Sequence, residues 1–151
     1  MAIEPNPNAC RRLQGRIDGL DNVAIVKAAL ADEQKTMILA LRGRRSQLVP
    51  EEGGRCTRVA VFTADGLIAA GRAPLPHVLK IDAEGFELEV LRGMKGLLRW
   101  DGLRVIGMEV HHALLAERGV PDAPREIERR LTEAGFAISW ADASHIIASR
   151  K

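Results

Sequence analysis

Carboxylate and imidazole side chains follow three apolar segments of this chain, and their chemistry is the first clue to a site. Glu4 ends a short apolar stub, Asp82 and Glu84 follow the run HVLKI, and Glu109 and His111 close the run RVIGMEVH. A carboxylate can accept two hydrogen bonds from a ribose diol, because its oxygens match the spacing of vicinal hydroxyls. Imidazole titrates near neutral pH and suits a general base. The sequence therefore predicts a site of carboxylates with a base.

Each of these carboxylates also has a simpler interpretation. Glu4 is equally explained as a surface acid near a helix N-terminus, where the macrodipole favours negative charge. Asp82 or Glu84 could instead cap the helix that we expect to begin near Gly85. Lys80 lies two residues before Asp82, so the two side chains point to one face of a strand. We favour a ligand role for Asp82 and Glu84, which capping does not exclude.

A metal centre is the weaker hypothesis for the same residues. Asp82, Glu109, His111 and His112 could be combined into a metal cluster, but two adjacent histidines and scattered acids are a weak signal. A general base at His111 is favoured over a metal ligand, and we expect no metal. The chain has no nucleophile elbow, Walker loop or CxxC motif.

Hydrophobic periodicity places these residues in an alternating α/β pattern. We expect strands at 2–4, 22–27, 35–41, 58–62, 77–82, 104–110, 136–140 and 145–148. We expect helices after Pro7, at 65–70, at 86–100 and from Pro124, with a loop at 42–55. The pattern predicts an α/β sheet buried on both sides, with helices on both faces and a C-terminal antiparallel hairpin.

Composition narrows the class of protein. The 151 residues indicate a single domain, 1–151, with 46% apolar and 28% charged residues. The net charge of +2 is spread out, so we expect no nucleic-acid partner, and no apolar run is long enough to predict a membrane partner. Cys10 and Cys56 are too few for a disulfide scaffold, so the sequence predicts a cytoplasmic protein.

The motifs AIEPNPNACRRL, NVAIVKAALADE, HVLKIDAEGFELEVLRGM and VIGMEVH, in this order, resemble the FkbM family of methyltransferases. They cover nearly the whole chain, and the third is the most specific. The resemblance implies a Rossmann-like class I methyltransferase fold. It also implies methyl transfer from S-adenosyl-L-methionine to an oxygen, typically a hydroxyl of a sugar or a secondary metabolite.

The resemblance implies roles for individual positions on the cofactor side. Glu4 would hold the cofactor ribose, with Asn6 alongside it. Ala29 and Asp32 would lie near the adenine, and Asp82 would face the methyl group.

On the reaction side, the resemblance implies that Asp82 and Glu84 face the methyl-transfer site with Lys80 in support. Glu109 and His111 would line the substrate side. The sequence leaves the methyl acceptor itself open.

The family pattern also implies a first strand, a Gly-Ala-Asn-x-Gly loop and a helix ahead of the EPNP segment, and this sequence lacks them. We therefore expect weak or no cofactor binding and no activity by this polypeptide alone. The alternatives are a fragment of a longer product, direct pairing of the flanking strands, or a strand from another chain with self-association through exposed edges. Two further functions stay open, a non-catalytic Rossmann-like remnant acting as a binding or interaction module, and a nucleotide-binding domain with other chemistry.

Overall fold

The structure is a computed structural model that describes residues 1–42, 45–50 and 54–151. In chain order its elements are β1 (Ala2–Ile3), α1 (Pro7–Ile17), β2 (Ile25–Val26), β3 (Ala29–Leu30), β4 (Lys35–Arg42), β5 (Arg45–Val49), β6 (Cys56–Phe62), α2 (Ala64–Ala69), β7 (Val78–Asp82), α3 (Glu87–Arg92), α4 (Lys95–Arg99), β8 (Val105–Glu109), α5 (His112–Glu117), α6 (Ala123–Glu133), β9 (Ala137–Trp140) and β10 (His145–Ser149). None of the described helices is long and apolar enough to span a bilayer.

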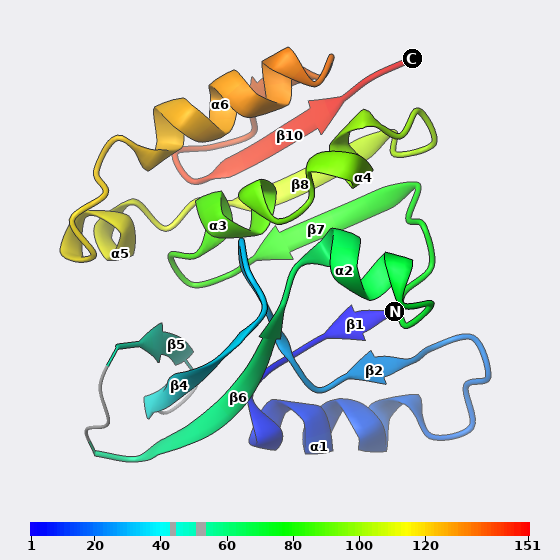
Figure 1. Ribbon diagram of the computed structural model, residues 1–151, viewed down its shortest axis with the longest axis vertical. Coiled ribbons are helices and arrows are strands. Elements are labelled where there is room, and N and C mark those ends of the chain that lie inside the picture. The colour runs from blue at the N-terminus through cyan, green and yellow to red at the C-terminus, as the bar shows by residue number, and fades with distance from the viewer. Residues whose placement is uncertain (43–44, 51–53) are drawn as a thin grey trace.

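The described strands form three sheets, ordered β1-β2, β3-β6-β4-β5 and β7-β8-β10-β9. β1 runs parallel to β2 and β7 runs parallel to β8, whereas β10 is antiparallel to both β8 and β9 (Figure 1). Figure 1 shows the β1 and β7 arrows pointing the same way, so Glu4, after β1, and Asp82, at the end of β7, lie toward the same end of the two strands. The α/β class and the C-terminal hairpin predicted from the sequence are therefore confirmed.

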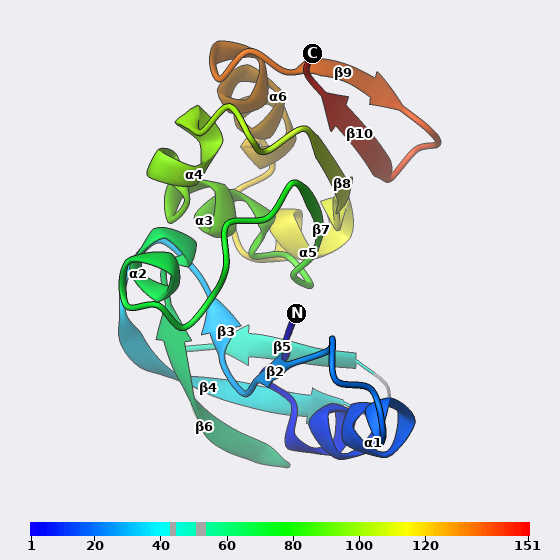
Figure 2. The same ribbon diagram turned by 90° about the vertical axis from the view of Figure 1, so that its right-hand side faces the viewer.

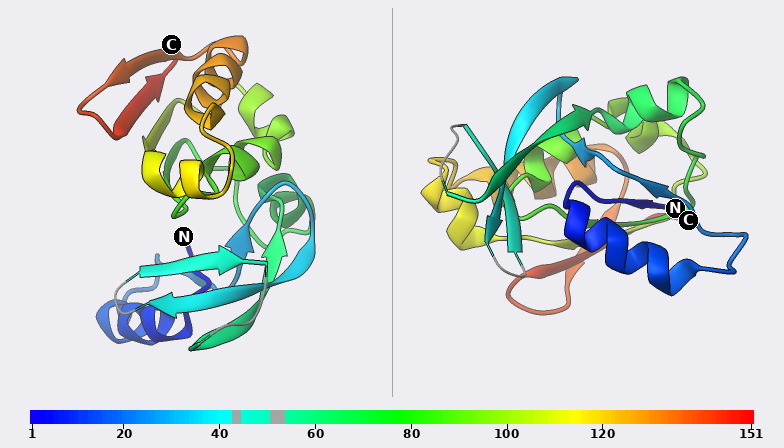
Figure 3. Two further views of the ribbon diagram at one scale, coloured as in Figure 1. Left: turned by 90° about the vertical axis from the view of Figure 1, so that its left-hand side faces the viewer. Right: turned by 90° about the horizontal axis from the view of Figure 1, so that it is seen from below.

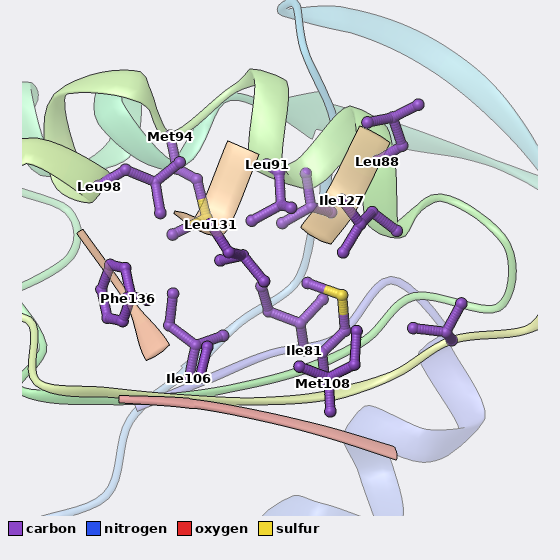
Figure 4. Close-up of a cluster of buried hydrophobic side chains, with 14 of the residues drawn as sticks. Ile81, Leu88, Leu91, Met94, Leu98, Ile106, Met108, Ile127, Leu131 and Phe136 are labelled. Atoms are coloured by element: carbon purple, nitrogen blue, oxygen red, sulfur yellow. The ribbon is translucent and has the colours of Figure 1, made fainter. Parts of the chain in front are cut away.

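The larger hydrophobic core lies between the β7-β8-β10-β9 sheet and helices α3, α4 and α6 (Figure 4). Its strand and helix contributions include Ile81, Ile106, Met108, Leu91, Ile127 and Leu131. Burial alternates along the strands, so that Ile146 is 1% exposed while the adjacent Ile147 is 46% exposed. Helices thus cover one face of this sheet, and the prediction of a sheet buried on both sides, with helices on both faces, is wrong for these strands in the described chain. Their side chains alternate between the helix-covered core and an exposed face.

The helix predicted over 86–100 is broken into α3 and α4 at Gly93. A Cβ atom at Gly93 would lie 2.0 Å from the carbonyl oxygen of Ala31, so the chain passes here against neighbouring backbone. The second helix restarts because Asp65, in α2, accepts the backbone N–H of Gly96 at 2.7 Å. Periodicity alone predicted one helix, because the apolar positions keep their spacing through the break.

Replacing Gly93 by alanine is expected to lower the free energy of unfolding by about 3 kcal/mol, because the backbone facing it must move. Gly15, in α1, is the matched control, since nothing lies within 4 Å of a Cβ there. Gly15→Ala should raise the free energy of unfolding by up to about 1 kcal/mol, because alanine favours the helix. Urea unfolding of both variants checks the pair, and a Gly93→Ala protein as stable as the parent would refute the close approach.

Several elements differ from the sequence prediction. The loop expected at 42–55 contains β5, which pairs antiparallel with β4, while residues 43–44 and 51–53 lie outside the described residues. The polar sequence RSQLV gives no strand signal, because Leu48 is the one side chain of the strand among residues 46–49 that lies in the buried core. The strand expected at 22–27 shrinks to β2, and the short elements β3 and α5 were not predicted.

Candidate active site

A cavity of about 730 Å³ lies between β1 and β7. In the described part of the chain, β1 pairs with β2 and β7 pairs with β8, so both strands border the cavity with a free edge. Figure 2 shows the N-terminus between the part of the chain that holds β7 and the part that holds β2, and the left view of Figure 3 shows the same arrangement from the opposite side. The polar residues that line it are Glu4, Asn6, Ser46, Lys80, Asp82 and Glu84.

Glu4 and Asn6 form the turn between β1 and α1. The backbone N–H of Asn6 donates to Glu4 Oε1 at 2.7 Å. Asn6 is the N-cap of α1, as its position before Pro7 predicts, and its Oδ1 accepts the N–H of Asn8 at 2.8 Å. Its Nδ2 donates to Ser46 Oγ at 2.5 Å. Asn6 is 5% exposed and its amide serves the fold, whereas the contacts of the described residues give the Glu4 side chain only the Asn6 N–H, on Oε1.

Cys10 supports this turn from beneath. Its Sγ donates to the carbonyl oxygen of Glu4 at 3.1 Å, and the residue is 2% exposed. Burial, and after it the nearby Glu4 carboxylate, raises the pKa of the Cys10 thiol above its usual value. Cys10 therefore stays a neutral thiol and plays a packing role.

Lys80 and Asp82 lie in the C-terminal half of β7 and line the cavity. Lys80 Nζ lies 3.8 Å from Asp82 Oδ2 and 3.9 Å from Glu109 Oε2. The shared face expected for Lys80 and Asp82 is thus observed, and β8 brings Glu109 beside them in register, opposite Asp82. Because these side chains are partly exposed, the ion pairs orient the groups more than they stabilise the fold.

A tight turn carries Glu84 from β7 into α3. Glu84 has φ of 45° and Gly85 has φ of 91°, both in the left-handed region. A Cβ atom at Gly85 would lie 2.9 Å from Leu114 Cβ, so glycine is also needed for packing. Helix α3 begins after Phe86 without a side-chain cap, so neither Asp82 nor Glu84 caps it. The simpler interpretation of these carboxylates is therefore not observed.

His111 joins the carboxylates from the end of β8. Its Nε2 atom lies 3.5 Å from Glu84 Oε2, 3.6 Å from Glu109 Oε1 and 3.8 Å from Asp82 Oδ1. The imidazole is 18% exposed, so it borders solvent at one edge. The structure thus brings together the five residues that the sequence assigned to the reaction side: Lys80, Asp82, Glu84, Glu109 and His111.

Sequence reasoning missed one member of this cluster, Glu87. Its side chain is fully buried, and its Oε1 lies 2.8 Å from His111 Nδ1. A signal was present: Glu87 precedes Val90, Leu91 and Met94 at helical spacing, so an acid occupies the apolar face of the predicted helix. That position should have marked Glu87 as a paired, buried charge.

The same cluster offers donors for a cation. Ligand atoms of Asp82, Glu84 and His111 lie within 4.8 Å of one another. Carboxylates and imidazole are a donor set that divalent metals accept. Lys80 already supplies positive charge to Asp82, and the expectation of no metal stays a prediction.

The two residues predicted near the adenine, Ala29 and Asp32, line different cavities. Ala29, in β3, is 5% exposed and lines the cavity with Glu4 and Asp82. Asp32 instead lines a second hollow of about 620 Å³, beside Lys35, Phe86 and Arg118. The short connection after β3 turns Asp32 away, so the structure does not bring Asp32 to the lining of the first cavity.

The β9-β10 turn reaches the rim of the cluster through His145. Its Nε2 lies 3.6 Å from Glu109 Oε2, and its Nδ1 lies 2.9 Å from Asp142 Oδ1. The backbone N–H of Ser144, followed by the His145 side chain, holds the pKa of Asp142 well below its usual value. Asp142 therefore stays charged at neutral pH and fixes the turn beside Glu109.

Comparison with known proteins identifies what this arrangement resembles. The sequence model of the family described as "Methyltransferase FkbM domain" matches residues 1–138. The hexuronic acid methyltransferase AglP of Haloferax volcanii is 28% identical over 137 residues, which are 88% of this chain and 52% of that protein. The chain thus spans about half the length of this curated relative.

A solved structure agrees with the fold. The crystal structure of methyltransferase FkbM from Methylobacillus flagellatus KT superposes with a TM-score of 0.58 and 15% identity. The match covers 98% of this chain and 35% of that one. At this level of identity the likeness concerns the fold alone.

Proposed function

The chain belongs to the FkbM methyltransferase family, and we propose that it transfers a methyl group from S-adenosyl-L-methionine to a hydroxyl oxygen of a sugar or a secondary metabolite. The observation that carries this proposal is that Glu4, after β1, and Asp82, at the end of β7, line one cavity. The relative named for hexuronic acid methylation favours a sugar acceptor. We also propose that residues 1–151 form one domain, and the two free cysteines suit the cytoplasm.

The residues of the cavity fit S-adenosyl-L-methionine, which supplies a methyl group already activated on a positively charged sulfur. The cavity volume of about 730 Å³ lies in the range of small-molecule sites. The free oxygen of Glu4 would accept from the ribose diol, and the small side chain of Ala29 would leave room for the adenine. The carboxylate of Asp82 would face the sulfur and favour its positive charge.

His111 would remove the proton of the acceptor hydroxyl. The ring presents Nε2 among the carboxylates of Asp82, Glu84 and Glu109, which favour a positive charge there. An acceptor hydroxyl beside Nε2 would be held in line with the methyl group while it loses its proton. The carboxylate of a hexuronic acid would point away from these acidic side chains, because like charges repel.

The cavity itself supports a further part of the proposal. We expect a strand to insert between β1 and β7 and to hydrogen-bond with the free edges of both. No glycine occurs among the described residues that line the cavity, so close backbone approach to the methionine part of the cofactor needs this added segment. Full cofactor binding and activity then depend on the segment.

The free edges of β1 and β7 also favour the second candidate function, a non-catalytic binding or interaction module. Val78, on β7, is 68% exposed, so an apolar strand edge is open to a partner or to self-association. The two candidates differ in whether any form of the protein modifies an acceptor.

Transfer of a deuterated methyl group tests the function. We expect a form extended by the added segment to label a free hexuronic acid or a neutral hexose at a hydroxyl, which mass spectrometry detects. The same sugar with every hydroxyl already methylated is the control and should gain no label. Stoichiometric cofactor binding without label on any hydroxyl acceptor would favour the module instead, and transfer of hydride or phosphate would favour the nucleotide-binding alternative.

A further inference from the structure

Glu87 is a glutamate buried inside the domain, with no exposed surface. Its Oε1 accepts the backbone N–H of Gly85 at 2.9 Å and contacts His111 Nδ1 at 2.8 Å. Its Oε2 has no hydrogen-bond partner in the described residues. Burial of a charge with one oxygen unsatisfied is unfavourable, and an apolar side chain of similar size would pack better there. The fold alone therefore does not explain a glutamate at this position.

We propose that Glu87 is a positioning residue for His111, holding the imidazole by Nδ1 so that Nε2 receives the proton of the acceptor hydroxyl. The proposal rests on the proposed methyl transfer, and it adds a residue that sequence reasoning did not assign. Glu87 acts through His111, since its full burial keeps it from touching the acceptor.

The hydrogen bond selects one tautomer of the neutral ring. A carboxylate only accepts hydrogen bonds, and Oε1 already accepts the N–H of Gly85, so the contact with Nδ1 requires the hydrogen to sit on Nδ1. Nε2 is then left with its lone pair, which is the form that can take up a proton. Without Glu87 nothing in the described contacts of Nδ1 imposes this choice.

Negative charges surround the His111 ring on both sides. When Nε2 takes a proton, the imidazolium has Glu87 behind it and the carboxylates of Glu84 and Glu109 within 3.6 Å in front. These groups are fixed before the reaction, so they stabilise the positive charge without reorganising. The buried carboxylate contributes most strongly per contact, because it is shielded from water.

The proposed transfer moves a methyl group to the acceptor and a proton to His111. In the proposed transfer, a lone pair of the acceptor oxygen would form a bond to the methyl carbon while the bond from that carbon to sulfur breaks. The electron pair of the broken bond would stay on sulfur and leave a neutral thioether. The hydroxyl proton moves to His111 Nε2, which carries away the positive charge.

One oxygen of Glu87 also ties together two parts of the site. Gly85 belongs to the turn after β7 that carries Glu84, whereas His111 follows β8. Bonding to both through Oε1 fixes the ring relative to that turn. Such support from residues behind the reacting groups is what keeps a site in productive geometry.

Nitrogen-15 spectra of histidine-labelled 151-residue protein test the proposal without any activity, at a pH where the ring is neutral. We expect hydrogen on Nδ1 of His111 in the parent protein, with the signal assigned by its loss in His111→Gln. Glu87→Met, which fills the space but cannot accept, should move the hydrogen to Nε2. Glu87→Gln should keep it on Nδ1, because the amide oxygen can still accept. Hydrogen on Nε2 in the parent protein overturns the proposal, even if a variant fails to fold.

Kinetics of the methyl-transferring, extended form supply the second readout. Glu87→Met should lower kcat by about 100-fold with the KM for the cofactor nearly unchanged, and Glu87→Gln should recover part of the loss. Glu89→Met is the control, because Glu89 lies on the same helix but pairs with Arg118, and kcat should change little. Equal loss in Glu87→Met and Glu89→Met would overturn the positioning role. The expected tautomer without methyl transfer by any form would instead overturn the proposed function.

Discussion

The 151-residue polypeptide alone is expected to bind S-adenosyl-L-methionine at least about 100-fold more weakly than a form in which a strand, a glycine-bearing loop and a helix precede residue 1. The reason lies in the cavity between β1 and β7, where both strands have a free edge in the described chain. The residues after β1 and β7 supply the acidic side of the site. The added strand would supply the opposite wall and the backbone donors.

The size of the effect follows from the contacts at stake. Each hydrogen bond to the cofactor contributes about 1 kcal/mol, so loss of two or three weakens binding roughly 100-fold. The free strand edges would also leave the site less ordered, and the entropy cost of ordering it would reduce the binding free energy.

Calorimetric titration of both forms, under one buffer and salt, measures this difference. ATP, which shares the adenosine moiety, is the matched control and should not discriminate between the forms as strongly. Micromolar binding of S-adenosyl-L-methionine by the 151-residue polypeptide alone would refute the need for the segment.

Asp82→Asn is expected to lower kcat/KM of the extended form by about 1,000-fold, with the fold retained. The substitution keeps the shape of the side chain but removes the negative charge that lies 3.8 Å from both Lys80 Nζ and His111 Nε2. A neutral amide no longer favours the cationic sulfur or the proton that arrives on His111. Two functions of one carboxylate are thus lost together.

The control for this variant is Asp101→Asn, because Asp101 is an exposed acid in the turn after α4. It should leave kcat/KM within about 2-fold of the parent, as surface substitutions generally have small effects. Steady-state kinetics with a sugar acceptor, together with unfolding curves for both variants, separate a chemical effect from a folding defect. Activity of Asp82→Asn close to that of the parent would remove Asp82 from the reaction.

The elements that carry the site were the most predictable from sequence, for a physical reason. A charge after a run such as HVLKI must leave the core, so Asp82 had to stand at the tip of β7. Asn6 before Pro7 likewise predicted the start of α1. An asparagine side chain can accept the free N–H groups of the first helical turn, and a proline suits the first helical position.

What sequence could not predict depends on contacts far along the chain. The break at Gly93 requires the carbonyl of Ala31 to lie beside it, and no local pattern reveals that approach. Asp32 turns away from the cavity for a similar reason, since the path after β3 is set by its pairing with β6. Glu87 is a different case. The sequence shows its position on an apolar helix face, but only the structure shows its contact with His111.

A crystal structure of the extended form with S-adenosylhomocysteine, the product of the proposed reaction, is the decisive experiment. We expect the ribose hydroxyls on the carboxylate of Glu4 and the sulfur directed toward Asp82 and His111, with a strand between β1 and β7. A nucleoside bound elsewhere, or β1 and β7 paired directly with each other so that the space between them is closed, would contradict it.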